Sequence, residues 1–205
     1  MHRSLVLAAT FLTLSCSDST APTSSDSPLA ALIPIDFEQY PGPDGMLGTR
    51  DDVRLPGCPG NTGTCVVTSL SNEFESVGVM FENWFVTYQH GDNPNNFSNN
   101  NHRACAGSDP QPLVRLRVPI FGVAVTSLAT WPVRLDAFDT DGALIGSSFL
   151  PHPNPGCLGS CPQVHGIVVF DSTVPIASFR LTNVSPGGEF TGGCVDNLIL
   201  RPSQN

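Results

Sequence analysis

Apolar and polar residues alternate along much of the chain with a period of two, the pattern of β-strands that bury one face. The alternation is plain at residues 177–182, where polar side chains separate Ala177, Phe179 and Leu181. A continuous apolar run at residues 167–170 instead predicts a strand that is buried on both faces. Further strand patterns occupy residues 32–38, 66–70, 74–88, 114–118, 123–131, 133–138, 143–150 and 195–200. The pattern at residues 74–88 is broken near Glu82-Asn83. No stretch has convincing helical periodicity.

Turn residues separate these predicted strands. The clearest signal is at residues 139–142, where Asp-Thr-Asp-Gly lies between two apolar segments and predicts a β-hairpin. Glycine and proline, with 19 residues each, supply many further turns. About ten short strands with this punctuation predict one all-β domain over residues 31–203. Its expected fold is an antiparallel β-sandwich of the jelly-roll type.

Composition and charge exclude several classes of protein. The chain has 205 residues, a formal net charge of −9, and nine basic residues that are all arginine. An acidic chain of this kind lacks the basic face of a nucleic-acid-binding protein. Hydrophobic residues make up 40% of the chain, which is too many for wholesale disorder. The shortage of charged helix-forming residues excludes a coiled coil.

The first residues have the organisation of an export signal. Residues 1–3 form a short positive head, and residues 4–14 form an apolar run that is too short to cross a bilayer. The Ser15-Cys16 pair follows at once, and the whole pattern resembles the lipobox of bacterial lipoproteins. The resemblance implies that residues 1–15 are a signal peptide and that Cys16 receives a diacylglyceryl group. The alternative is ordinary signal-peptide cleavage further along, with Cys16 incidental.

Residues 16–30 are rich in Ser, Thr, Pro, Asp and Ala. Such a segment buries little apolar surface, so it predicts a flexible tether between the anchor and the folded domain. The expected location is therefore the bacterial cell envelope, at the outer membrane or cell surface. The membrane is then a partner through the lipid anchor.

The cysteines support an exported location. Six cysteines follow Cys16, and an even number in an exported chain indicates disulfides. Spacing favours two local pairs and one long pair, namely Cys58–Cys65, Cys157–Cys161 and Cys105–Cys194. Zinc is the alternative, but CxxC pairs are absent and no histidine lies at ligand spacing beside a cysteine pair.

Three segments resemble exported bacterial jelly-roll domains, which are common in surface proteins with PEP-CTERM-type anchors. Residues 71–81 are similar to their NEF…GV.F segment, and residues 133–147 are similar to their V.L.AYDADG.LLGS hairpin. Residues 195–198 are similar to their closing strand, which contains an Asp-Asn pair. The resemblance implies the fold and an extracellular setting. Carbohydrate-binding modules belong to the same fold class.

A first candidate site combines Asp36-Phe37-Glu38 with Asp196. Many carbohydrate-binding jelly rolls open with a Phe-Glu pair and close with an Asp-containing strand, and the resemblance implies a structural calcium ion held by Glu38 and Asp196. Calcium prefers six to eight oxygen ligands, which strand-borne carboxylates supply in part. Asp196 shares its predicted strand face with Leu198, so it is expected to point toward the core. In the alternative, these acids are merely exposed or hydrogen-bonded.

A second candidate is the acidic loop at residues 43–52, which carries Asp44, Asp51 and Asp52. It resembles the DG..GT.DD segments that recur in exported bacterial proteins, some of them beside calcium-binding repeats. Its two glycines allow a tight turn that brings the three carboxylates together as metal ligands. The spacing does not match an EF-hand, and a solvated acidic turn is the alternative.

A third candidate is a surface for a glycan. Trp84 and Tyr88 share one face of a predicted strand, and residues 89–103 follow as a polar loop that contains Asp92 and His102. Aromatic rings stack on sugars, and neighbouring polar groups bind their hydroxyls. In the alternative, Trp84 belongs to the core and the loop is only a connection.

Signals for catalysis are weak. No GxSxG, HExxH, P-loop or dinucleotide-binding motif is present in the sequence. The sequence therefore predicts a non-catalytic, lipid-anchored surface domain that binds a glycan. Two alternatives stay open: a secreted polysaccharide lyase or glycosidase, whose paired carboxylates are invisible in sequence, and a purely structural envelope module.

Overall fold

A computed structural model describes eight segments of the chain: residues 34–58, 64–89, 102–107, 112–129, 132–151, 164–185, 188–191 and 193–202. Most of the described residues belong to strands, and the one helical element among them is a short 3-10 turn, η2 (Glu75–Val77). Within these segments no helix is long and apolar enough to cross a membrane. The all-β prediction is therefore confirmed.

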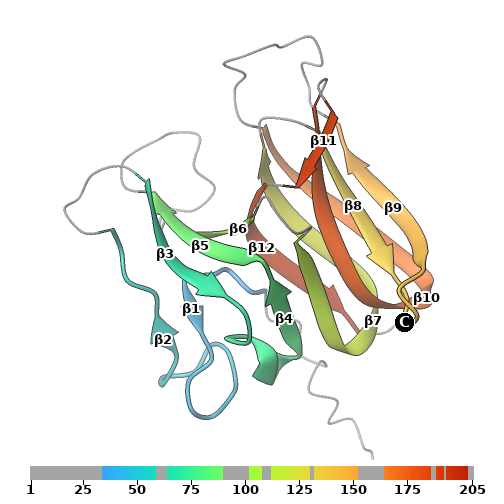
Figure 1. The fold of residues 1–205 in the computed structure, drawn as a ribbon. Helices are drawn as coiled ribbons and strands as arrows, with labels where there is room; N and C mark the ends of the chain where they lie inside the picture. Colours follow the sequence, from blue (N-terminus) through green and yellow to red (C-terminus); the bar gives the residue numbers. More distant parts are fainter. Residues whose placement is uncertain are drawn as a thin grey trace, which may run out of the picture.

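The strands form a two-stranded and a ten-stranded sheet (Figure 1). The small sheet pairs β1 (Gln39–Tyr40) with β2 (Val53–Arg54). The large sheet contains β3 (Thr64–Leu70), β4 (Val79–Glu82), β5 (Trp84–Gln89), β6 (His102–Ala106), β7 (Leu113–Ala129), β8 (Val133–Phe138), β9 (Leu144–Leu150), β10 (Val164–Ser185), β11 (Gly188–Thr191) and β12 (Cys194–Arg201).

Two long strands, β7 and β10, divide the large sheet into two layers. In the first layer the strand order is β3-β5-β6-β12, followed by the second half of β7 and then the first half of β10. The first half of β7 pairs with β4, and the second half of β10 pairs with β8, which leads to β9. We call these layers the β12 sheet and the β8 sheet. Register shifts in β10 between Asp171 and Ser178 mark the transition between them.

The core lies between the two layers. Four aromatic side chains, Phe37, Phe74, Phe81 and Trp84, pack edge to face with ring centroids 5.7 to 5.8 Å apart. They meet further apolar residues of both sheets, including Val125, Phe179, Leu181 and Leu198. Burial of this continuous apolar cluster is the main stabilising contribution to the fold.

Two predicted strands differ from the structure. In residues 74–88, a 3-10 turn takes the place of the first part of the predicted strand. The break predicted near Glu82-Asn83 is confirmed, because Asn83 takes a left-handed conformation (φ 58°) that separates β4 from β5. The prediction that residues 167–170 are buried on both faces is wrong, because Ile167 is 62% and Val169 is 37% exposed. Within the described residues, this half of β10 pairs only with β7, and its second face is the outer surface of the β12 sheet.

Candidate functional site

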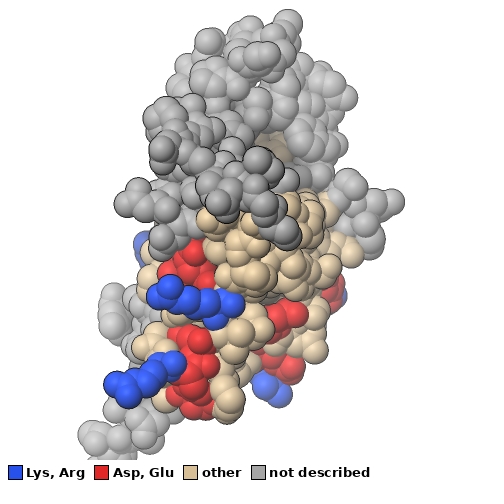
Figure 2. Space-filling model, turned by 90° about the vertical axis from the view of Figure 1, so that its left-hand side faces the viewer, with Lys and Arg blue, Asp and Glu red and all other residues tan. Residues whose placement is uncertain are grey.

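A polar pocket of about 430 Å³ opens where the N-terminal segment crosses β5 and β6. Its lining combines charged, amide and aromatic side chains with one glycine: Asp36, Glu38, Gln39, Arg54, Leu55, Gly57, Tyr88 and His102. Figure 2 views the molecule from the side of the small sheet, where carboxylates and arginines lie close together on the surface. We refer to this cavity as the Tyr88 pocket.

The N-terminal segment reaches the pocket through two local features. Ile35 and Leu198 of β12 exchange two backbone hydrogen bonds of 3.0 Å, so the start of the domain lies beside its closing strand, as a joint site of Glu38 and Asp196 requires. Phe37 then takes a left-handed conformation (φ 61°), which is costly for a non-glycine residue, and its fully buried ring anchors the turn. The chain therefore leaves β12, and Glu38 reaches β6.

Glu38 and His102 form the central contact of the pocket. The Glu38 carboxylate accepts the backbone N–H of His102 at 3.1 Å and lies 2.7 Å from its Nδ1. On the other side of the ring, Nε2 lies 3.2 Å from the carbonyl oxygen of Pro56. Burial lowers the pKa of His102, but the hydrogen bonds to Glu38 and Pro56 outweigh it, and the net shift is upward.

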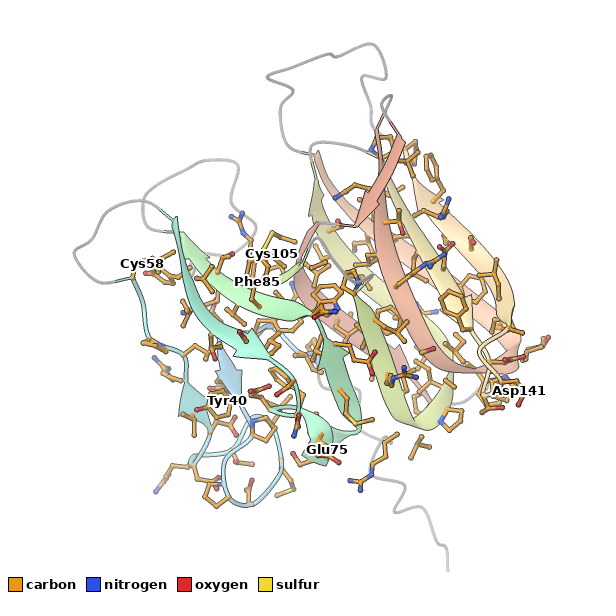
Figure 3. The ribbon with its side chains drawn as sticks, viewed as in Figure 1. Tyr40, Cys58, Glu75, Phe85, Cys105 and Asp141 are labelled. Carbon is orange, nitrogen blue, oxygen red and sulfur yellow. A yellow bond between two sulfur atoms is a disulfide. The ribbon has the colours of Figure 1, made fainter. Side chains whose placement is uncertain are left out.

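Tyr88 forms an aromatic wall of the same pocket. Its ring centroid lies 4.7 Å from that of His102, with the two planes inclined by 60°. Gly57 borders the ring, and a β-carbon placed on it would lie 3.5 Å from the Tyr88 side chain. The adjacent Cys58–Cys65 disulfide, marked by Cys58 in Figure 3, ties the end of the N-terminal segment to β3. Cys65 is in turn the register partner of Tyr88.

Asp196 of β12 is only 2% exposed, and it interacts electrostatically with the pocket acids Glu38 and Asp36. Among the described residues, its Oδ2 has no hydrogen-bond partner. Burial raises the pKa of Asp196 to about 6, with a further upward contribution from Glu38 and an opposing one from Arg103. The inward orientation predicted for Asp196 is thus present, in an incompletely satisfied electrostatic environment.

The residues predicted to bind a glycan do not all lie in the same place. Tyr88 and His102 both line the pocket. Trp84 is only 2% exposed and packs against Phe81, so its indole is a core group that no ligand reaches, as the alternative reading expected. Asp92 lies outside the described residues.

The acidic loop is organised by its own hydrogen bonds. The Asp52 carboxylate accepts the backbone N–H groups of Gly48 (2.6 Å) and Thr49 (3.2 Å) and the side-chain amide of Gln39 (2.8 Å). Asp51 accepts the backbone N–H of Asp44 at 3.1 Å and the Thr49 hydroxyl at 2.7 Å. These bonds lower the pKa of Asp51, and they account for the shape of the loop.

Calcium prefers six to eight oxygen ligands, which is more than the acidic side chains of the described residues bring together at one point. Within the described segments, no group of three or more His, Cys, Asp or Glu side chains is placed to hold a metal ion. Glu38 directs both carboxylate oxygens at His102, and Asp36 accepts the backbone N–H of Glu38 at 3.1 Å. The described residues therefore do not fit a calcium site in this conformation, and binding of calcium by Glu38 and Asp196 would require Glu38 to leave His102.

Two of the three predicted disulfides are present. Cys58–Cys65 has a Cα–Cα distance of 5.8 Å, and Cys105–Cys194 has one of 4.1 Å. The long bridge joins β6 and β12, where the two cysteines are register partners (Cys105 in Figure 3). The Cys157–Cys161 pair lies outside the described residues. For the four described cysteines, disulfides rather than zinc are confirmed.

Sequence reasoning missed the contributions of Gln39, Arg54 and Gly57 to the pocket and of Arg103 to the charge behind it. The first three follow the predicted Phe-Glu pair, on a segment with no repeating pattern that would assign them a face. Arg103 adjoins His102, and that His-Arg pair between a polar loop and an apolar strand was the one available signal.

Comparisons with known proteins show distant likeness only. No protein-family model matches the chain, and no curated protein is similar to it in sequence. Similar solved structures include a family 6 carbohydrate-binding module at 12% identity and a TM-score of 0.36, over 84% of this chain and 95% of that chain. A DUF4465 family protein from Bacteroides caccae has 10% identity and a TM-score of 0.42 (83% and 100% coverage). The K1 cleaved adhesin domain of Lys-gingipain from Porphyromonas gingivalis has 11% identity and a TM-score of 0.37 (85% and 99%). At these TM-scores the similarities do not support an argument about function. Evidence for function has to come from the pocket itself.

Proposed function

We propose that this chain is a non-catalytic, extracellular carbohydrate-binding domain whose ligand occupies the Tyr88 pocket. The observation that carries the proposal is the combination of one aromatic ring with several hydrogen-bonding side chains around a single cavity. Sugars present apolar C–H faces that stack on aromatic rings, and hydroxyls that pair with carboxylates, amides and guanidinium groups.

The pocket supplies both kinds of contact. Tyr88 offers the ring, while Asp36, Gln39 and Arg54 offer polar groups at the opening. Its volume of about 430 Å³ lies within the range of small-ligand sites. This size suits a chain end or a short branch of a glycan better than a long stretch of polysaccharide.

A glycan array followed by calorimetry tests the proposal. We expect Tyr88→Ala to weaken binding about tenfold or more, because a lost stacking contact and its buried area amount to over one kcal/mol. Tyr88→Phe retains the ring and is expected to bind within a fewfold of the natural protein. Phe149→Ala is the matched control, since Phe149 is 53% exposed on β9 and does not line the pocket.

Gly57→Val gives an independent test of the same pocket. Gly57 does not have a positive φ, and a β-carbon there meets Tyr88 at an ordinary contact distance of 3.5 Å, so the larger side chain enters the cavity without backbone strain. We expect this variant to fold normally and to lose glycan binding. Full binding by both Gly57→Val and Tyr88→Ala would place the ligand elsewhere and refute the proposed site.

A polysaccharide-degrading enzyme is the second candidate, because Asp36 and Glu38 both line the pocket. Glycosidases use a pair of carboxyl groups as acid and base or nucleophile. Against this role, Glu38 is committed to His102, and both ring nitrogens of His102 already face acceptors. We expect no release of reducing ends or unsaturated products from any glycan that binds; product formation that Asp36→Asn abolishes would establish the enzyme instead.

We further propose that the domain is held at the bacterial cell envelope through a lipid on Cys16. Cys16 and the tether at residues 16–30 lie outside the described residues. Disulfides in the folded domain support an exported location. Cys16→Ser removes the thiol that would receive the diacylglyceryl group. Because stable anchoring needs more than one acyl chain, the variant is expected to leave the membrane fraction. Membrane retention of this variant, or a mature chain that begins at another residue, would contradict the anchor.

A further inference from the structure

We infer that His102 is a positioning residue of the Tyr88 pocket, held as an imidazolium between Glu38 and Pro56, and that ligand binding weakens when it loses its proton. The inference rests on the proposed carbohydrate site and adds its regulation by pH. It assigns to one buried histidine the role of holding the N-terminal segment, which forms one wall of the pocket, against β6.

The protonation state follows from the partners of the two ring nitrogens. Nδ1 lies 2.7 Å from a Glu38 carboxylate oxygen, and Nε2 lies 3.2 Å from the Pro56 carbonyl oxygen. A carbonyl oxygen cannot donate a hydrogen bond, and neither can an ionised carboxylate. Both nitrogens of His102 must therefore carry hydrogen for both contacts to be hydrogen bonds, and only the imidazolium satisfies that condition.

These two contacts connect three parts of the pocket wall. His102 belongs to β6, Glu38 precedes β1, and Pro56 follows β2. One further bond holds the same wall, from the backbone N–H of Leu55 to the carbonyl of Glu38 at 3.0 Å. Gly57, which borders Tyr88, comes directly after Pro56. The position of this wall relative to the Tyr88 ring thus depends on the His102 contacts.

The surrounding charges favour the protonated ring. Burial lowers the pKa of His102, while its hydrogen bonds to Glu38 and Pro56 and the charges of Glu38 and Asp36 raise it. Asp196 and Arg103 lie behind the pocket and bear opposite charges. Arg54 is the cation of the pocket lining, and the aromatic wall is the Tyr88 ring at 4.7 Å from His102. The hydrogen bonds and the nearby acids together outweigh burial, so the net shift of the His102 pKa is upward.

Loss of the proton leaves one of the two contacts without a hydrogen. The neutral ring still donates to one acceptor, but its other nitrogen then faces an oxygen lone pair, which is repulsive. Either Glu38 or the Pro56 segment is released. Glu38 also retains lone pairs beyond the two used by His102, so a fixed Glu38 accepts hydroxyl groups of a ligand. A neutral, hydroxyl-rich glycan is accordingly expected to bind more tightly at mildly acidic pH than at alkaline pH.

NMR titration of the histidine side chains in the purified protein tests the protonation state without any ligand. The chain has five histidines, and the other four provide an internal reference. We expect the signal assigned by His102→Gln to titrate with a pKa above the ordinary value of about 6.5. Glu38→Gln is expected to lower that pKa, because it removes the anionic partner. A pKa of His102 below 6.5 in the natural protein would overturn the inference.

Calorimetry between pH 5.5 and 8.5, with the glycan identified by the array, tests the effect on binding. We expect the affinity to fall about fivefold across this range, the size expected for one lost hydrogen bond. In His102→Gln, whose amide donates but does not titrate, the affinity is expected to be the same throughout. His165→Gln is the matched control, because His165 belongs to β10, none of whose described side chains lines the pocket, and it is expected to keep the fivefold change.

The outcomes separate this inference from the proposed function. An affinity that does not change with pH, despite a raised pKa of His102, would overturn the regulatory role while leaving the glycan site intact. If no glycan binds at any pH, the proposed function and the regulation of it both fail. In that case, a raised pKa of His102 that Glu38→Gln lowers would still support the clamp between Glu38 and Pro56.

Discussion

Two aspartates in this domain are equally buried, each only 2% exposed, yet their surroundings shift their pKa values in opposite directions. Asp136 of β8 accepts hydrogen bonds from Arg134 (2.9 and 3.2 Å), Arg180 (3.0 Å) and the Ser147 hydroxyl (2.6 Å). Burial raises its pKa, but these partners outweigh burial and the net shift is downward. Asp196 of β12 has one oxygen without a partner among the described residues, and its pKa is raised to about 6.

The difference shows what each region of the molecule does. The Asp136 network lies on the outer face of the β8 sheet, where three strands supply its partners, and its complete pairing makes it a structural element. Asp196 lies behind the Tyr88 pocket, close to Glu38 and Arg103, where pairing is incomplete. Buried polar groups that lack hydrogen-bond partners are found mainly at functional sites.

The largest expected effect concerns the disulfide that closes the Asp196 region. The Cys105–Cys194 bridge spans 89 residues, and the chain-entropy model assigns it about 4 to 5 kcal/mol of unfolding free energy. Cys58–Cys65 spans only 7 residues, for which the same model gives about 2 kcal/mol. Denaturant unfolding of Cys105→Ala/Cys194→Ala and Cys58→Ala/Cys65→Ala measures both, and equal losses would show that loop length does not control their contributions.

The second prediction breaks the Asp136 network. Asp136→Asn is expected to lower the unfolding free energy by about 3 kcal/mol, because two arginines lose their shared charged partner in a buried position. Asp171→Asn is the control: Asp171 pairs with Arg201 through two bonds of 2.9 and 3.1 Å, but both side chains are largely exposed. An exposed pair contributes about 0 to 1 kcal/mol. A loss no greater for Asp136→Asn than for Asp171→Asn would refute the structural role.

The third prediction is that the same substitution at the other buried aspartate acts in the opposite direction. At pH 8, Asp196 is ionised and buried, which costs free energy, so Asp196→Asn is expected to stabilise the domain by about 1 kcal/mol or more. At pH 4 the natural carboxyl group is largely protonated, and the variant should show little difference. Destabilisation at pH 8 comparable to that of Asp136→Asn would mean that Asp196 is fully paired.

The pH dependence of stability follows from the same groups. A raised pKa of Asp196 gives stability that is present below about pH 4 and lost as pH rises toward about 6. The raised pKa of His102 gives stability that is present below about pH 6.5 and lost above it. Asp136 acts in the opposite sense, since its lowered pKa loses stability as pH falls below about 4. Thermal melts should therefore show a maximum near pH 4, and a maximum above pH 8 would contradict these assignments.

The smallest expected effect concerns calcium. Because Glu38 is committed to His102, we expect millimolar calcium followed by a chelator to leave the melting temperature nearly unchanged at pH 8. A bound ion at a hundredfold excess over its Kd would instead add about 2.7 kcal/mol. A rise in melting temperature that Asp196→Asn abolishes would establish the calcium site and displace His102 as the partner of Glu38.

The sequence allowed the fold to be predicted because alternation and turn signals are local. The hairpin between β8 and β9 follows from such a pattern. The two disulfides were instead predicted from the number and spacing of the cysteines, and the position of Ile35 beside β12 agrees with the jelly-roll resemblance. The outer face of β10 was misjudged because a continuous apolar run does not distinguish a doubly buried strand from one that exposes Ile167 and Val169.

The site was only partly predictable, because its parts meet through tertiary contacts. Tyr88 and His102 were identified from residue type, but their union with Glu38 depends on the left-handed turn at Phe37, a conformation that nothing in its neighbouring residues indicates. The sequence left two positions open for Trp84 for a related reason. A tryptophan on an alternating strand is equally suited to a ligand platform or to a core, and the packing of Phe81 decides in favour of the core.

The central claim is that the ligand is bound at the pocket around Tyr88 and His102 rather than on the β8 sheet. Addition of the glycan selected by the array to isotopically labelled protein at pH 5.5, followed by NMR, tests it most directly. We expect saturable shifts in the signals of Gln39, Tyr88 and His102, with those of Ser147 and Phe149 on β9 unchanged. Shifts centred on Ser147 and Phe149, with the pocket signals unmoved, would contradict the account.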